Sequence, residues 1–321
     1  MIKDLKQFIY RFALIISTLF FLLLMGACKS IRSIQIPAFV IGSNLGDTRV
    51  RPVDDKLMLF VPAGEFEMGI DDEMLKEAKQ LCKDFLGDLA LTICRNSAFR
   101  NEQPVHTVEL DSFWIDKTEI TNDQYRMCVE AGACIPPVET GSFSRESYFE
   151  DHAYGDFPVI YVNWTMASTY CAWVGARLPT EAEWEYSARG PNHFVFPWGN
   201  EFDKTKLNYC DLSCKGVSDE SFDDGFSDTA PVGSFPEGRS WVGALDMAGN
   251  VREWVHDWFA PYPNEKVRNP AGPDNGVSKI PRGGSWYDTP DDTRSTNRGE
   301  NLPDYSRHKV GFRCAVSQIS E

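Results

Sequence analysis

The chain has 321 residues and a formal net charge of −15 at pH 7, from 32 lysine and arginine residues against 47 aspartate and glutamate residues. A surface this acidic repels phosphate backbones, which excludes nucleic acid as an expected partner, and it suits a protein that holds divalent cations. The length accommodates one large domain or two small ones. From Lys56 onward no composition break, repeat or low-complexity run divides the sequence, so we predict one domain.

The N-terminus has the pattern of an export signal. Three positive charges precede an apolar run of 14 residues over 12–25, and the small residues Gly26 and Ala27 follow. Cys28 then resembles the lipobox cysteine of bacterial lipoproteins, which is acylated, typically with palmitate, and becomes the mature N-terminus. Met25 stands where leucine is usual. The alternative is an uncleaved membrane anchor, but the run is shorter than the roughly 20 residues that a membrane-spanning helix needs.

We therefore expect a lipoprotein signal peptide at 1–27, a lipidated tether at 28–55 and a folded domain at 56–321. The tether has few large apolar side chains and no clear period. Lys29 after the lipidated cysteine favours the outer membrane over retention at the inner membrane. The expected location is the cell envelope, lipid-anchored at the outer membrane or cell surface. Removal of the signal peptide takes away three positive charges and one negative charge, and leaves a net charge of about −17.

The chain contains nine cysteines, so eight remain if Cys28 carries lipid. Export to an oxidising compartment makes disulfides the expected state. Three pairs are close in sequence, and the remaining two cysteines would join the middle of the domain to its last strand: Cys82–Cys94, Cys128–Cys134, Cys210–Cys214 and Cys171–Cys314. The alternative is a metal site, although no C-x-x-C knuckle is present. Spacing alone does not fix the connectivity.

The first half of the domain carries clear element signals. Residues 58–67 read as a strand, a Pro-Ala-Gly turn and a second strand, and 73–85 has apolar residues at helical spacing. Residues 105–115 look extended. Three further helices are predicted by their caps: Thr121 with Gln124 for a helix to Ala131, Asn163 for a helix to Val174, and Thr180 with Glu183 for a helix to Arg189.

After Arg189 the helical signals fade, and glycine, proline, aspartate, asparagine and tryptophan become frequent. Long irregular segments in a compact domain usually need disulfides or bound ions to hold them. We therefore predict a loop-rich α+β fold.

At this point a family resemblance is visible. Nine sequence blocks occur in order over roughly 57–317 and together resemble the formylglycine-generating enzyme, or sulfatase-modifying factor, family: VPAGEFEMG (61–69), EQPVHTVELDSFWIDKTEITNDQY (102–125), FPVIYVNW (157–164), ARLPTEAEWEYSAR (176–189), PWGN (197–200), TAPVGSF (229–235), DMAGNVREWVHDW (246–258), RGGSW (282–286) and VGFRCA (310–315). The resemblance implies a variant of the C-type lectin fold with small antiparallel sheets. It also implies a bridge between Cys171 and Cys314.

The resemblance further implies two structural calcium sites, each transferred residue by residue. The first comprises Asn208, Tyr209, Asp224 and Phe226. The second comprises Asp246, Gly249, Val251 and Glu253, with Asp246 where the family often has asparagine. Side-chain and carbonyl oxygens of this kind are the ligands that calcium prefers. The alternative is that these are ordinary acidic loop residues.

The sequence departs from the family pattern at the residues that carry out the family's reaction. The enzyme oxidises a cysteine of a sulfatase peptide to formylglycine with molecular oxygen, using Cu(I) held by two thiolates, because soft thiolates select Cu(I). Those cysteines lie three and eight residues after the serine of the Gly-Gly-Ser motif, which here is Ser285. The matching positions are Asp288 and Thr293. We therefore expect no copper and no catalytic residue of the known mechanism.

Other chemistries find little support. The five histidines show no metal-pair spacing, and neither H-E-x-x-H, G-x-S-x-G nor a phosphate-binding loop is present. Ser285 has no evident base partner. Iron-dependent relatives draw ligands from an extra helical domain, which the tether is too short to supply.

Three functions remain. In the first, a binding module for peptide, glycan or an envelope protein uses the polar segment 286–309, with groove candidates Ser285, Trp286, Arg294 and Arg298; some lipoproteins of this fold are diversified there by reverse transcription. In the second, an oxidoreductase of the family has altered metal chemistry, with a metal at Asp288. In the third, the chain is an accessory subunit of an envelope complex. We favour a binding or accessory role.

Overall fold

The computed structural model describes residues 44–95, 99–214 and 218–318, without the side chains of residues 92 and 93. The predicted signal peptide, Cys28 and the tether up to residue 43 lie outside the described residues. Within the described ranges, no helix combines the length and the apolar character needed to cross a membrane.

The first sheet contains four antiparallel strands in the order β1 (Thr48–Arg51), β2 (Lys56–Val61), β5 (Phe113–Asp116) and β10 (Ala315–Ser317). Strand β1 falls in the expected tether, so the domain boundary at residue 56 is too late. The strand is held by charge as well as by its ladder: buried Arg51 pairs with Asp54 at 2.6 Å and with Asp116 at 2.8 Å. A polar strand stabilised in this way gives no hydrophobic signal in the sequence.

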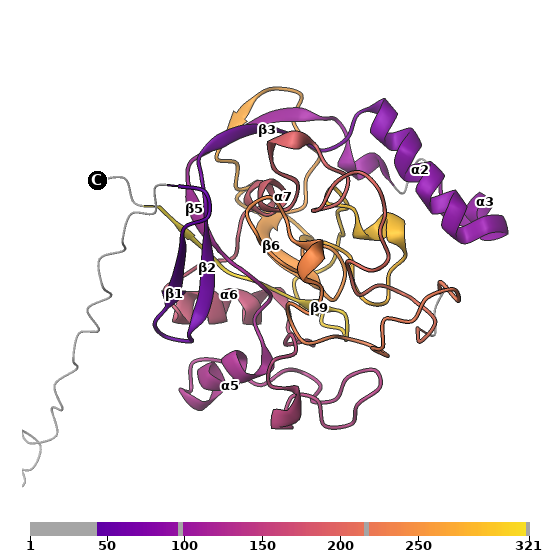
Figure 1. The fold of residues 1–321 in the computed structure, drawn as a ribbon. Coiled ribbons are helices and arrows are strands. Elements are labelled where there is room, and N and C mark those ends of the chain that lie inside the picture. The colour runs from indigo at the N-terminus through magenta and orange to yellow at the C-terminus, as the bar shows by residue number, and fades with distance from the viewer. Residues whose placement is uncertain (1–43, 96–98, 215–217, 319–321) are drawn as a thin grey trace, which may run out of the picture. The chain divides into compact units, whose positions relative to one another are not determined.

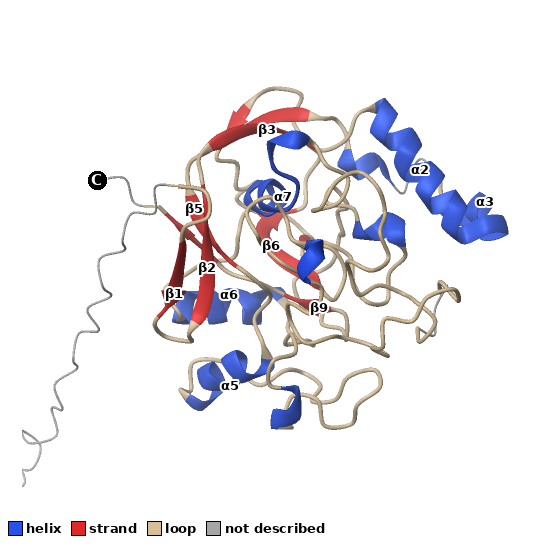
Figure 2. Cartoon of the chain, viewed as in Figure 1, coloured by secondary structure: helices blue, strands red, loops and turns tan. Residues whose placement is uncertain are grey.

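The other two sheets have three strands each (Figure 2). One has the order β3 (Gly64–Met68), β4 (His106–Leu110) and β7 (Val267–Arg268), and the other has the order β8 (Lys279–Arg282), β6 (Arg252–Trp258) and β9 (Val310–Gly311). The extended run expected at 105–115 is real but is divided, and its two halves enter different sheets as β4 and β5.

The predicted helices are confirmed. They are α2 (Asp72–Leu86), α5 (Asn122–Glu130), α6 (Trp164–Trp173) and α7 (Glu181–Arg189), accompanied by the short α3 (Ala90–Ile93). Both predicted capping boxes form, and the Asn163 side chain accepts a hydrogen bond from the Met166 amide. Short 3-10 turns complete the chain: η1 (Gly87–Leu89), η2 (Arg100–Glu102), η3 (His152–Tyr154), η4 (Gly190–Asn192), η5 (Pro236–Gly238) and η6 (Pro290–Thr293).

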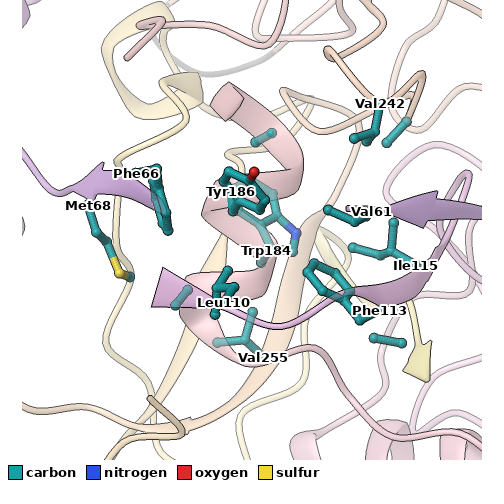
Figure 3. Close-up of a cluster of buried hydrophobic side chains, with 14 of the residues drawn as sticks. Val61, Phe66, Met68, Leu110, Phe113, Ile115, Trp184, Tyr186, Val242 and Val255 are labelled. Carbon is teal, nitrogen blue, oxygen red and sulfur yellow. The ribbon is translucent and has the colours of Figure 1, made fainter. Parts of the chain in front are cut away.

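The main core is built around α7, all of whose residues are buried. Figure 3 shows Trp184 and Tyr186 of this helix between Phe66 of β3 on one side and Val61 and Ile115 of the first sheet on the other. The Trp184 indole donates to Glu253 at 2.8 Å, so its polar atom is satisfied inside the core. Helix α7 therefore joins all three sheets. The predicted α+β class with small sheets is confirmed.

All four predicted disulfides are present: Cys82–Cys94, Cys128–Cys134, Cys171–Cys314 and Cys210–Cys214. The third joins α6 to the segment just before β10, across 143 residues of sequence. Cross-linking over so long a loop restricts the unfolded chain most, and in the chain-entropy model it contributes about 5 kcal/mol.

Candidate functional site

The Gly-Gly-Ser turn after β8 brings the two family positions together. Gly283 and Gly284 have φ angles of +91° and +69°, a region that favours glycine. A Cβ on Gly284 would lie 2.8 Å from the carbonyl oxygen of Asp292 and 2.9 Å from Cα of Thr293. The turn therefore packs directly against η6, and Ser285, Asp288 and Thr293 occupy one neighbourhood.

Asp288 is the centre of a buried charge cluster. Its Oδ2 accepts from the Ser285 hydroxyl at 2.6 Å and from Arg252 Nε at 2.7 Å, and its Oδ1 accepts from Lys309 Nζ at 2.9 Å. Burial alone would raise the pKa of Asp288, but Arg252 and Lys309 hold that pKa well below its ordinary value. The carboxylate is thus ionised and already occupied by two cations.

Thr293, the second position, is fully buried and donates its hydroxyl to the Pro290 carbonyl at 2.8 Å. It stabilises the η6 turn. The eight cysteines of the described residues are all in disulfides, so none of them supplies a thiolate here.

An aromatic cluster lies beside this charge cluster; it comprises Phe143, Trp286, Tyr287 and His308. The Phe143 ring centroid is 5.3 Å from that of Trp286, 6.0 Å from that of Tyr287 and 5.5 Å from that of His308. Trp286 is buried beneath, whereas Phe143 is 39% exposed. Burial and then Lys309 lower the pKa of His308, and its Nδ1 has no hydrogen-bond partner among the described residues. The cluster thus presents a partly exposed aromatic surface with a neutral imidazole.

Ser285, Trp286, Arg294 and Arg298 do not line one open groove together, because none of these side chains is more than 5% exposed. Arg298 borders one pocket of the described domain and Arg294 borders another. Arg294 forms a two-pronged ion pair with Glu102, at 2.8 Å and 2.7 Å. Arg298 pairs in the same way with Glu181, at 2.6 Å and 2.8 Å. The carboxylates lie about 190 and 117 residues away in sequence, so the sequence around the arginines does not reveal that they are buried.

The first predicted calcium set is brought together only in part. Asp224 lies with Asp211 and Asp223 in a group whose carboxylate oxygens are within 4.8 Å of one another. Its Oδ2 is buried without a hydrogen-bond partner among the described residues. Burial, followed by the charge of Asp211, raises the pKa of Asp224 to about 8. A divalent cation would relieve this repulsion, and the all-oxygen donor set fits calcium.

The remaining members of that set are divided. The Phe226 carbonyl accepts from the Ser213 hydroxyl, which also contacts Asp211, so Phe226 lies at the carboxylate group. The Asn208 amide instead donates to Asn250 and to the Asp228 carbonyl in a separate buried network. The sequence reasoning missed Asp211, whose position between the cysteines of the 210–214 loop is the signal that could have indicated it.

The two carboxylates of the second predicted set, Asp246 and Glu253, have different partners. Both carboxylate oxygens of Glu253 accept from Arg313, at 2.6 Å and 2.7 Å, so this side chain is already paired. Asp246 lies with fully buried Glu119, which the sequence reasoning missed. Burial and then Asp246 raise the pKa of Glu119 well above its ordinary value, and its Oε2 has no partner in the described part of the chain. Glu119 and Asp246 therefore fit a cation better than Glu253 does.

Two backbone positions of the second set, Gly249 and Val251, are also placed. Gly249 has a φ of +80°, and a Cβ there would lie 2.2 Å from the Asn208 carbonyl oxygen, so the 246–258 segment packs tightly against Asn208 of the first set. Val251 is buried. The two predicted sets are therefore neighbours in space through the Asn208–Asn250 network.

Small sheets packed around a buried α7, together with a Gly-Gly-Ser turn that packs against the segment of Asp288 and Thr293, match a domain of the formylglycine-generating type. The family model described as the sulfatase-modifying factor enzyme 1-like domain matches residues 45–318. The chain belongs to this family.

Comparison with individual proteins supports this assignment. The chain is 30% identical to the formylglycine-generating enzyme of Bos taurus, over 84% of this chain and 77% of that protein. It is 39% identical to the inactive C-alpha-formylglycine-generating enzyme 2 of Mus musculus, over 56% of this chain and 54% of that protein. The solved structure of PvdO from Pseudomonas aeruginosa is 26% identical with a TM-score of 0.64, and the match covers 86% of this chain and all of that one.

Proposed function

We propose that this chain is an exported, lipid-anchored binding protein of the cell envelope, whose formylglycine-generating-type domain recognises a peptide or glycan and does not perform the family's oxidation. The observation that carries the proposal is the occupation of Asp288 by Arg252 and Lys309. A carboxylate held in two ion pairs is a poor ligand for Cu(I), which prefers thiolates. A relative named as inactive supports the view that the fold persists without the reaction.

The ligand surface in this proposal is the aromatic cluster. Exposed aromatic rings beside fixed charges suit amphipathic ligands, since sugar rings and peptide side chains stack on the rings while polar groups meet the charges. Phe143 is the exposed member, and Tyr287 lies next to it with Lys309 Nζ 5.5 Å above its ring. Calcium belongs to the same proposal as a structural ion that orders the loops behind this surface.

Binding of the purified protein to glycan and peptide arrays tests the proposal. Phe143→Ala and Tyr287→Ala should each weaken binding of the best array ligand about tenfold, as expected for loss of an aromatic contact worth roughly 1–2 kcal/mol. Val277→Ala is the matched control, because this side chain is 76% exposed and belongs to the loop before β8.

The same preparation is given Cu(I) and a cysteine-containing sulfatase peptide, and oxygen uptake is recorded. No uptake is expected. Oxygen consumption with formation of formylglycine would overturn the proposal, as would array binding that is equally insensitive to all three substitutions.

A further inference from the structure

A helical arm formed by residues 71–95 and 99–102 is a distinct feature of the domain. It contains α2, η1, α3 and η2, and the Cys82–Cys94 disulfide ties α2 to the end of α3. The arm has a small core, which it shares with Ile70 just before it: Ala78, Cys82, Leu86, Ala90, Cys94 and Phe99. In Figure 1 the arm projects from the side of the domain opposite β1 and β2.

The base of the arm is fixed. Arg294 pairs with Glu102 and lies over the Phe99 ring at 5.1 Å, and Arg298 donates to the Asn101 carbonyl at 2.6 Å. The arm is therefore held rigidly to the domain, and its tip is presented in a defined orientation.

The tip exposes apolar side chains. Leu91 is 89% exposed, the highest value among the exposed large hydrophobic residues of the described chain, and Leu89 is 51% exposed. Leu91 lines an open recess of about 870 Å³ that residues of α2 and α3 also border. Within the described residues, the Leu91 side chain is therefore almost fully exposed.

The recess is also positively charged, against the sign of the whole chain. Its lining includes Lys79, Lys83, Arg95 and Arg100 and a single carboxylate, Asp88. Lys83, Arg95 and Arg100 are exposed. A local net charge of +3 in a chain of −15 is a marked contrast. Leucines surrounded by cations form a surface that complements an apolar side chain flanked by carboxylates.

Two other occupants fit less well. Symmetric pairing with a second copy would set the same cations against one another, which is repulsive. An anionic bilayer would attract the tip but repel the rest of the domain, because the chain as a whole is strongly acidic. We propose that the arm tip is a docking surface for an acidic amphipathic segment of a partner protein. This surface is separate from the aromatic cluster and does not depend on the function proposed for it.

The test uses two synthetic helical peptides of about 18 residues, long enough to retain helicity in water. Both carry the same leucine face, and the polar face is glutamate in one and lysine in the other. Binding to the full protein is measured by fluorescence anisotropy at low and high salt. The glutamate peptide should bind despite the net charge of −15 and should weaken at high salt.

The decisive variants are Leu91→Ser and the double substitution Lys83→Glu with Arg95→Glu. Each should weaken the glutamate peptide roughly tenfold, as expected for lost exposed contacts of this kind. Lys76→Glu is the matched control, since it lies on α2 outside the recess. Unchanged thermal unfolding verifies that the variants fold.

Three results would overturn the inference. The first is that the glutamate peptide does not bind. The second is that it binds the wild type and all variants equally. The third is that vesicles of phosphatidylethanolamine and phosphatidylglycerol bind in a way that depends on Leu91, whereas the glutamate peptide does not bind. The last outcome would assign the tip to a membrane surface instead.

Discussion

At the scale of single residues, buried carboxyl groups make the stability of this domain depend on pH. Asp257 is 5% exposed and accepts a hydrogen bond at 2.8 Å from the amide of Glu181, at the start of α7. Burial, followed by the charge of Glu181, raises the pKa of Asp257 to about 8. The protonated acid is therefore the form that the folded domain prefers, and ionisation of this group opposes folding.

This shift predicts a pH dependence of stability. A carboxyl whose pKa is higher in the folded than in the unfolded state contributes its full stability below about pH 4, and the contribution is lost as the pH rises toward 8. Asp257→Asn keeps the acceptor and removes the ionisation. We expect the variant to lose less stability than the wild type between pH 5 and pH 8, by about 1–3 kcal/mol. Urea unfolding at both values measures this, and parallel pH profiles would contradict it.

At the scale of elements, buried arginine–carboxylate pairs join segments that are far apart in sequence. Arg294 follows η6 and binds Glu102 at the end of η2, while Arg298 binds Glu181 at the start of α7. Arg313 joins the last segment to Glu253 of β6. Each pair is desolvated, so its partners are costly to separate even where the net contribution of the intact pair is small.

Removal of one partner should therefore destabilise the whole helix or strand that the pair anchors, and not only the site of substitution. Arg294→Ala leaves Glu102 buried without a counter-charge, and we expect a loss of about 3–5 kcal/mol. Because this pair holds the base of the arm, amide hydrogen exchange over α2 should accelerate more than exchange over α7. Asp304→Asn, at an exposed position, is the control. Uniform acceleration across both helices would contradict a local anchoring role.

At the scale of the whole described domain, the irregular second half is held by disulfides, by ion pairs and, in our proposal, by calcium. The carboxylate group around Asp224 and the pair Glu119–Asp246 each contain a buried oxygen atom without a hydrogen-bond partner among the described residues and a carboxyl group with a raised pKa. A bound cation would offset the repulsion between the carboxylates at each position. Asn250 links one of these positions to the proposed ligand surface, because its side chain donates to Glu119 and its carbonyl accepts from the Trp286 amide.

Calcium removal tests this arrangement. Binding at 100 times the dissociation constant stabilises a protein by about 2.7 kcal/mol, and chelation should lower the midpoint of thermal unfolding by roughly 5–10 °C. Asp211→Asn and Glu119→Gln should each reduce that difference and lower the calcium stoichiometry seen by calorimetry. An unfolding midpoint indifferent to chelator, with no calcium bound, would refute the two sites.

Local sequence determined several features of this protein. The caps at Thr121, Asn163 and Thr180 fixed three helices, because the hydrogen bonds that start a helix are made within four residues. The cysteine spacings agreed with the bridges, and the motif blocks identified the family. The identity of Asp288 and Thr293 is also a property of sequence alone.

The tertiary structure decided what depends on distant partners. Strand β1 joined the sheet because Arg51 meets Asp116, and Arg294 and Arg298 were buried because Glu102 and Glu181 receive them. Glu119 and Asp211 became candidate calcium ligands because the fold places them beside Asp246 and Asp224. An isolated charged residue reads as exposed, because the cost of burying a charge is offset only by a counter-charge that the fold, and not the neighbouring sequence, brings to it.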